Sequence, residues 1–175
     1  MDLHDFEPGP LYFDDPIPDG VEGLLQAASE AYPAPEAEAF LRQAEQKAPE
    51  HFMVLVARYR YYYYSHHLDS ALEVAARAMK KSARQLGLPE DYQSVEKSEF
   101  ERAYRESPSL SRFYLQALKG YGYLALRLGN RKLGTDALQK LAGLDECDRM
   151  GARSLLSVVE AHDAPAPGLR LAVSS

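Results

Sequence analysis

A repeat with a period of 34 residues is the feature that most constrains how this chain can fold. Seven positions of a first unit shift by that period onto seven positions of a second: Val21, Leu24, Leu25, Ala28, Ala37, Leu41 and Ala44 onto Leu55, Arg58, Tyr59, Tyr62, Ala71, Ala75 and Ala78. A third set lies 63 residues beyond the second, at Leu118, Tyr121, Gly122, Ala125, Gly134, Leu138 and Leu141. The excess over one period is 29 residues, so the sequence predicts units of about 18–51, 52–85 and 115–148 and an insertion over 86–114.

Apolar residues within each unit recur three and four positions apart, which is typical of a helix with one buried face. Prolines and glycines such as Pro33, Pro49 and Gly87 separate these segments. No segment alternates with period two, so we expect an all-α fold. The expected helices include one over 93–106, one over about 110–128 capped by Ser109 or Ser111, one capped by Asp69 or Ser70, and a last one starting near Asp148.

Small residues at the expected helix crossings, among them Ala37, Ala71 and Gly134, allow paired helices to approach closely. Together with the stretch 121–130 (YGYLALRLGN), with Leu144-Asp145 and with Pro49, they make residues 18–148 resemble the tetratricopeptide-repeat (TPR) family. The chain departs from that pattern at the family's tryptophan position, which holds Val21, Leu55 and Leu118. The resemblance implies a TPR-like domain over 18–162, a right-handed stack of antiparallel helix hairpins with about three repeats, a helical insertion and a C-terminal capping helix. A non-repeating helical bundle is the alternative.

Composition excludes several classes of protein. The net charge is −6, which argues against binding to nucleic acid. No apolar run is long enough to span a membrane, and the first residues lack the features of a secretion signal. A single cysteine, Cys147, permits no intrachain disulfide and fits a reducing cytoplasm. We therefore expect a cytoplasmic protein that is not attached to a membrane.

Charge is unevenly distributed along the chain. Residues 1–50 carry 12 acidic and two basic side chains, whereas residues 51–175 carry 14 acidic and 18 basic ones. Arg77, Lys80, Lys81 and Arg84 form a basic stripe at helical spacing. This stripe could bind an acidic partner or the acidic part of the same chain, or it could simply be a solvated helix face.

The tyrosine-rich segment 58–67 (RYRYYYYSHH) is the strongest candidate for a binding site. Tyr59 and Tyr62 fall on the expected core stripe, and the remaining tyrosines cannot all face inward. In a TPR-like repeat the first helix of each unit lines the concave surface, and tyrosine and arginine are favoured at interfaces. The residues predicted to bind a peptide or helix of a protein partner are Met53, Val56, Arg60, Tyr63, Tyr64, Gln116, Lys119, Tyr123 and Arg127. The alternative is that the tyrosines mostly fill the core or that the insertion covers them.

Both ends of the chain are expected to differ from the helical domain. Residues 1–17 are rich in proline, acidic and aromatic residues, and they could be disordered or could occupy the tyrosine-rich groove. The groove could receive this segment from its own chain or from another copy. Residues 163–175 follow a proline-rich break and are expected to form a flexible tail.

Nothing in the sequence argues for catalysis, a cofactor or a metal site. His66 and His67 are adjacent, and His4, His51 and His162 are scattered, so no set of ligands converges in sequence. The glycines of Gly120-Tyr121-Gly122 are better explained by helix packing than by phosphate binding. We therefore expect a non-catalytic adaptor; a self-associating homodimer and a small-ligand carrier using the tyrosine–histidine segment are the alternatives. The segment from Pro49 to Met79 also resembles small repeat proteins found among nitrogen-fixation accessory genes, which implies a role in assembly or protection of a metalloenzyme.

Overall fold

The computed structural model of the protein describes residues 16–163. Within this range the fold consists of α-helices and one short 3₁₀ helix, without β-strands, as the sequence predicted. The elements are α1 (Val21–Ala31), α2 (Glu36–Lys47), α3 (Phe52–Tyr64), α4 (Leu68–Gln85), η2 (Tyr92–Ser94), α5 (Lys97–Glu106), α6 (Pro108–Arg127), α7 (Arg131–Leu144) and α8 (Ala152–Asp163). Apart from Pro16, Ile17 and Asp163, the two terminal segments expected over 1–17 and 163–175 lie outside the described residues.

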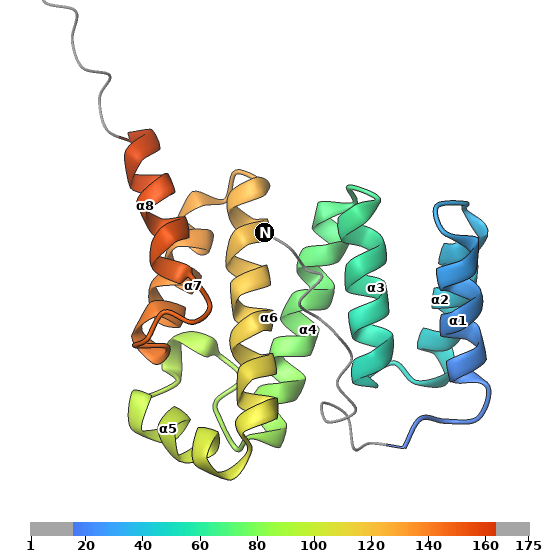
Figure 1. Cartoon of the computed structure of the whole chain (residues 1–175), viewed down its shortest axis with the longest axis horizontal. Helices are drawn as coiled ribbons and strands as arrows, with labels where there is room; N and C mark the ends of the chain where they lie inside the picture. The colour runs from blue at the N-terminus through green and yellow to red at the C-terminus, as the bar shows by residue number, and fades with distance from the viewer. Residues whose placement is uncertain (1–15, 164–175) are drawn as a thin grey trace, which may run out of the picture.

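The helices form three adjacent pairs, α1–α2, α3–α4 and α6–α7, each joined by a short turn that makes its two helices antiparallel. Figure 1 shows these pairs side by side along the long axis of the molecule, with α8 beyond α7. Between the second and third pairs, η2 and α5 cover one end of α6 and α7. The turn after α4 uses Gly87 in the left-handed region (φ 66°), where glycine avoids a steric penalty.

The small residues of the repeat lie at the helix crossings, as expected from the need for close approach. Ala37 and Ala71 are fully buried. At the crossing of α6 and α7, a Cβ atom on Gly134 would lie 2.8 Å from the carbonyl oxygen of Gly122, and a Cβ atom on Gly122 would lie 3.0 Å from Cγ of Leu138. Close packing of the third pair therefore depends on glycine at both positions.

Several helix starts differ from those expected. The predicted helix over 93–106 is divided into η2 and α5, and a capping box between Glu96 and Glu99 starts α5. Helix α6 begins at Pro108 rather than near Leu110, because proline is well tolerated in the first turn, where its missing N–H has no helical partner. Residues 108–114, assigned above to the insertion, therefore belong to α6. Helix α4 begins at Leu68, which places Asp69 and Ser70 inside the helix rather than at its cap.

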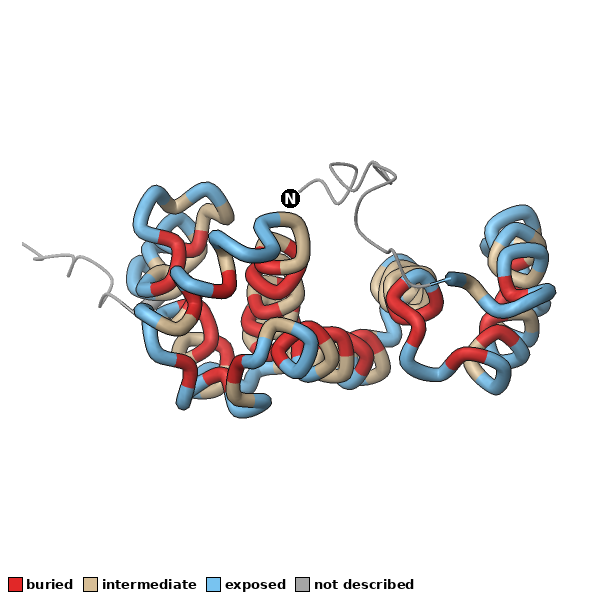
Figure 2. Tube along the Cα trace, turned by 90° about the horizontal axis from the view of Figure 1, so that it is seen from below, coloured by how far each residue is buried: buried red, intermediate tan, exposed pale blue. Residues whose placement is uncertain are grey.

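The α1–α2 pair packs less extensively on the remaining helices than those helices pack on one another. Its apolar contact with α3 is a small cluster in which Val54 meets Val21, Ala44 and Ala48. By contrast, larger clusters join α3, α4 and α6, and a continuous core extends from α4 to α8. Figure 2 shows the α1–α2 pair set off at one end of the molecule.

Ion pairs add a second connection between α2 and the α3–α4 pair. The carboxylate of Glu45 accepts hydrogen bonds from Arg58 and Arg77, the latter at 2.6 Å. Glu50 pairs with Arg84 at 3.0 Å and with Arg77 at 3.6 Å. Part of the basic stripe therefore binds acidic side chains of its own chain, which was one of the predicted alternatives.

Candidate functional site

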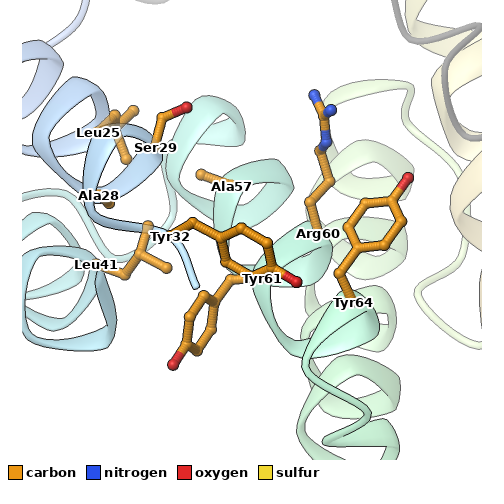
Figure 3. Close-up of a pocket in the computed structure, with 9 residues that line it drawn as sticks. All are labelled: Leu25, Ala28, Ser29, Tyr32, Leu41, Ala57, Arg60, Tyr61 and Tyr64. Atoms are coloured by element: carbon orange, nitrogen blue, oxygen red, sulfur yellow. The ribbon is translucent and has the colours of Figure 1, made fainter. Parts of the chain in front are cut away.

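A cleft separates the α1–α2 pair from one face of α3, and we call it the α1–α3 cleft. Its volume is about 480 Å³. Figure 3 shows the side chains of α1 and α2 facing those of α3 across it. The lining residues are Leu25, Ala28, Ser29, Tyr32, Leu41, Ala57, Arg60, Tyr61 and Tyr64. A mostly apolar and aromatic lining with a few polar groups is typical of binding clefts.

Side-chain size explains why the cleft exists. At its base, Val54 closes the contact between α3 and the α1–α2 pair. Ala57 lies three residues further along α3, and Ala28 lies opposite it on α1. Two methyl groups are too small to fill the space between the helices, so the leucines behind them, Leu25 and Leu41, form an apolar wall.

The rim of the cleft carries exposed aromatic rings. Tyr32 and Tyr64 are 43% and 39% exposed, which is high for side chains of this size. The Tyr32 and Tyr61 rings meet edge to face, with their centroids 6.2 Å apart. Partial burial, followed by the nearby carboxylate of Glu38, raises the pKa of Tyr61.

Arg60 is the cation of the cleft. No hydrogen bond or ion pair holds its guanidinium among residues 16–163, in contrast to Arg58 and Arg77, which bind Glu45 of α2. Figure 3 shows the Arg60 side chain extending alongside Tyr64. An arginine beside exposed aromatic rings, without a partner in the described part of the chain, is suited to bind a carboxylate of a ligand.

The structure divides the residues predicted to form one groove into two groups. Arg60 and Tyr64 line the α1–α3 cleft. Tyr63, Tyr123 and Arg127 instead meet between α3 and α6. The division arises because Tyr63 and Tyr64, as neighbours in a helix, point about 100° apart.

We call the second group, with Tyr59, the Tyr63 cluster. Burial, followed by the nearby hydroxyl of Tyr123, raises the pKa of Tyr63, whose ring stacks on that of Tyr59 with centroids 6.1 Å apart. Arg127 donates to the Tyr123 hydroxyl at 3.1 Å and lies 5.8 Å from the centre of that ring. These polar groups bind one another, so the Tyr63 cluster joins α3 to α6 rather than presenting free groups to a ligand.

The other predicted site residues lie apart from both groups or on their margins. Met53 is exposed in the first turn of α3, and Val56 packs against the cluster around Phe52. Gln116 and Lys119 are partly buried on α6. Burial lowers the pKa of Lys119, and the carboxylate of Asp148 opposes this effect.

Sequence reasoning missed the wall of the cleft formed by the first helix pair. Leu25, Ala28 and Leu41 were recognised only as repeat positions, and Tyr32 was not singled out. The available signal was size: Leu25 occupies the position that holds Gly122 in the third unit. A bulky residue at that position does not favour the close approach observed between α6 and α7.

Comparison with known proteins gives one informative relative. No protein-family model matches the chain, and no solved structure matches it. Over 164 residues the chain is 42% identical to the "Uncharacterized 19.8 kDa protein in nifW 5'region" of Azotobacter chroococcum mcd 1, with 94% of this chain and 92% of the relative covered. The chain belongs to the same family as this Azotobacter protein.

The described residues contain neither a set of side chains placed to hold a metal ion nor a helix suited to span a membrane. Across residues 16–163, no group of three histidine, cysteine, aspartate or glutamate side chains is placed to hold a metal ion. In that same part of the chain, no helix combines the length and apolar character required to cross a bilayer.

In this family member the buried hydroxyl of Tyr59 leads to a testable prediction. The hydroxyl has no hydrogen-bond partner among the described residues. Its pKa is raised mainly by burial and to a smaller extent by the neighbouring Tyr63. Tyr59→Phe removes an unsatisfied polar group, so we expect the free energy of unfolding at neutral pH to rise by about 1 kcal/mol. Urea denaturation followed by circular dichroism measures this change.

Alkaline pH should increase the difference in the free energy of unfolding between the wild-type protein and Tyr59→Phe. Because folding raises the pKa of Tyr59, the folded protein resists ionisation of the hydroxyl, and the free energy of unfolding falls as pH rises above the unfolded-state value of about 10. The wild-type protein should therefore lose stability faster above that pH than Tyr59→Phe. Tyr64→Phe, at the exposed rim, is the control, and equal alkaline curves for wild type and Tyr59→Phe would contradict the assignment.

Proposed function

We propose that this protein is a non-catalytic adaptor that binds a peptide or helix of a partner protein in the α1–α3 cleft. The observation that carries the proposal is one cleft that combines an apolar wall, exposed tyrosine rings and Arg60, whose guanidinium has no partner among the described residues. Tyrosine and arginine, together with tryptophan, are enriched among the residues that dominate binding energy at protein interfaces. The apolar wall would bind the hydrophobic side chains of the partner, and Arg60 would bind one of its carboxylates.

The same proposal includes a TPR-like architecture. The three helix pairs would be the repeats of a right-handed stack within residues 18–162, with η2 and α5 as an insertion and α8 as the terminal cap. The 34-residue spacing and the buried small residues at the crossings support this view. In such a stack the first helices of successive units, α1 and α3, form adjacent parts of one binding surface.

We further propose a biological setting for the adaptor. The printed name of the Azotobacter relative places it in the nifW 5' region. A relative of this similarity favours a related role for both proteins, so we infer that this protein is an accessory factor in nitrogen fixation. In this setting the adaptor would take part in the assembly or protection of a metalloenzyme in the cytoplasm.

Site-specific crosslinking provides the test. A photoreactive residue placed at Tyr64, on the rim of the cleft, should crosslink a partner in cells grown under nitrogen-fixing conditions. The same residue placed at Lys80, which is exposed on α4, should not crosslink it. The partner identified in this way is then purified for binding measurements.

Binding of that partner should depend on the cleft. The double variant Arg60→Ala with Tyr64→Ala should weaken binding by about 100-fold, since each hot-spot residue contributes about 1–2 kcal/mol. Lys80→Ala is the matched surface control. Unchanged affinity of a double variant that retains its helicity would exclude the cleft, and light scattering of the same samples would detect the alternative of self-association.

A further inference from the structure

The described part of the chain begins at the base of the α1–α3 cleft. Ile17 packs against the small cluster that joins the α1–α2 pair to α3, where Val54 meets Val21 and Ala44. Val54 precedes the cleft-lining residue Ala57 by three positions on the same helix, or about 4.5 Å. Residues 1–15 are therefore attached directly beside the cleft.

Chain length determines which residues of this segment can reach the cleft. From Val54 to Tyr64 the helix rises by about 15 Å. An extended chain covers about 3.4 Å per residue, so Phe13 can reach about 10 Å and Leu11 about 17 Å from Pro16. An extended chain from Pro16 would therefore allow Phe13, Tyr12 and Leu11 to reach the part of the cleft between Arg60 and Tyr64, which lie about 9 and 15 Å from Val54 along α3.

The chemistry of the segment matches that of the cleft. Residues 1–15 contain five acidic side chains and no lysine or arginine. Leu11, Tyr12 and Phe13 are followed by Asp14 and Asp15, so apolar rings and carboxylates are adjacent. The cleft offers an apolar wall and the guanidinium of Arg60. The carboxylate of Glu38, which lies near Tyr61, would repel an acidic segment.

We propose that Leu11, Tyr12 and Phe13 occupy the α1–α3 cleft of their own chain, with a carboxylate of the same segment bound by Arg60. Attachment beside the cleft gives the segment a high effective concentration, so modest contacts are enough to fill the site. Occupancy requires nothing from a partner. Its consequence rests on the proposed function: the segment is an autoinhibitory ligand that a partner must displace.

Tryptophan fluorescence tests occupancy directly because the chain contains no tryptophan. In the full-length variant Phe13→Trp, the emission should be blue-shifted, and acrylamide quenching should be several-fold weaker than in a synthetic peptide of residues 1–19 with the same substitution. Adding Arg60→Glu should restore peptide-like emission and quenching. Lys80→Glu changes the net charge equally on α4 and should leave the signal unchanged.

A second cleft variant, Phe13→Trp with Tyr64→Ala, checks the result without a charge change, and circular dichroism confirms that each variant is folded. Equal quenching in the full-length protein and the peptide, or a signal insensitive to both cleft variants, would overturn the proposal. Protection that increases with protein concentration would also overturn it, because the segment would then come from a second copy.

The partner experiment separates this proposal from the proposed function. Deletion of residues 1–15 should increase the affinity for the crosslinked partner several-fold. If the tryptophan signal depends on Arg60 but the partner binds elsewhere, the segment occupies the cleft and the adaptor function of the cleft is wrong. If the partner binds the cleft with the same affinity with and without residues 1–15, autoinhibition is wrong and the adaptor function stands.

Discussion

Gly134→Ala is expected to lower the free energy of unfolding by about 2 kcal/mol, although alanine is the better helix former. The added Cβ would lie 2.8 Å from the backbone oxygen of Gly122 and 2.6 Å from Cγ of Leu126. The leucine can change its rotamer, but the backbone oxygen cannot move unless α6 and α7 separate. Overpacking of this kind outweighs the gain in helix propensity.

Gly143→Ala on the same helix is the matched control. No atom lies within 4 Å of the Cβ that this substitution would add. Only the propensity gain remains, so we expect the free energy of unfolding to rise by about 0.5–1 kcal/mol. Urea denaturation of both variants measures the two changes, and a change of the same sign in both would refute the close crossing of α6 and α7.

Glu45→Ala is expected to lower the free energy of unfolding by a similar amount, about 2 kcal/mol. The carboxylate binds Arg58 and Arg77, whose side chains are 15% and 27% exposed, and its removal leaves both guanidinium groups with fewer partners. The effect is below that of a fully buried pair because solvent screens part of the interaction. It should diminish at high salt.

Hydrogen exchange should localise this effect. Because the α1–α2 pair has only a small apolar contact with α3, the loss of the ion pairs should accelerate exchange mainly within residues 21–47. Glu73→Ala, which removes an exposed carboxylate from α4, is the control and should change exchange little. Uniform acceleration over α6 and α7 as well would indicate that Glu45 stabilises the whole fold rather than one connection.

The repeat made much of the fold predictable from sequence. Helical spacing and the 34-residue shift predicted the helices of each pair, and the small residues Ala37, Ala71 and Gly134 are buried as expected. These features were predictable because they depend on local periodicity and on the size of single side chains. The predicted start of α6 near Leu110 was wrong because a proline such as Pro108 can either follow the end of one helix or begin the next.

The candidate site was less predictable for a physical reason. Periodicity indicates which face of a helix meets a neighbour, but not how closely the neighbour approaches. The sequence pointed to α3 and to Arg60 and Tyr64, whereas the opposite wall, with Leu25 and Leu41, depends on how far the α1–α2 pair lies from α3. That distance depends on the sum of many contacts between residues that are far apart in the sequence, including the ion pairs of Glu45 with Arg58 and Arg77.

The modest attachment of the α1–α2 pair also determines how wide a ligand the protein can accept. One wall of the cleft belongs to this pair and the other to α3, whose apolar contacts continue into the large core. Rotation of the pair about the short connection at 48–51 would alter the spacing of the walls while the α6–α7 crossing stays closed. Such a rotation would let the cleft accept ligands of different width without repacking the core that extends from α4 to α8.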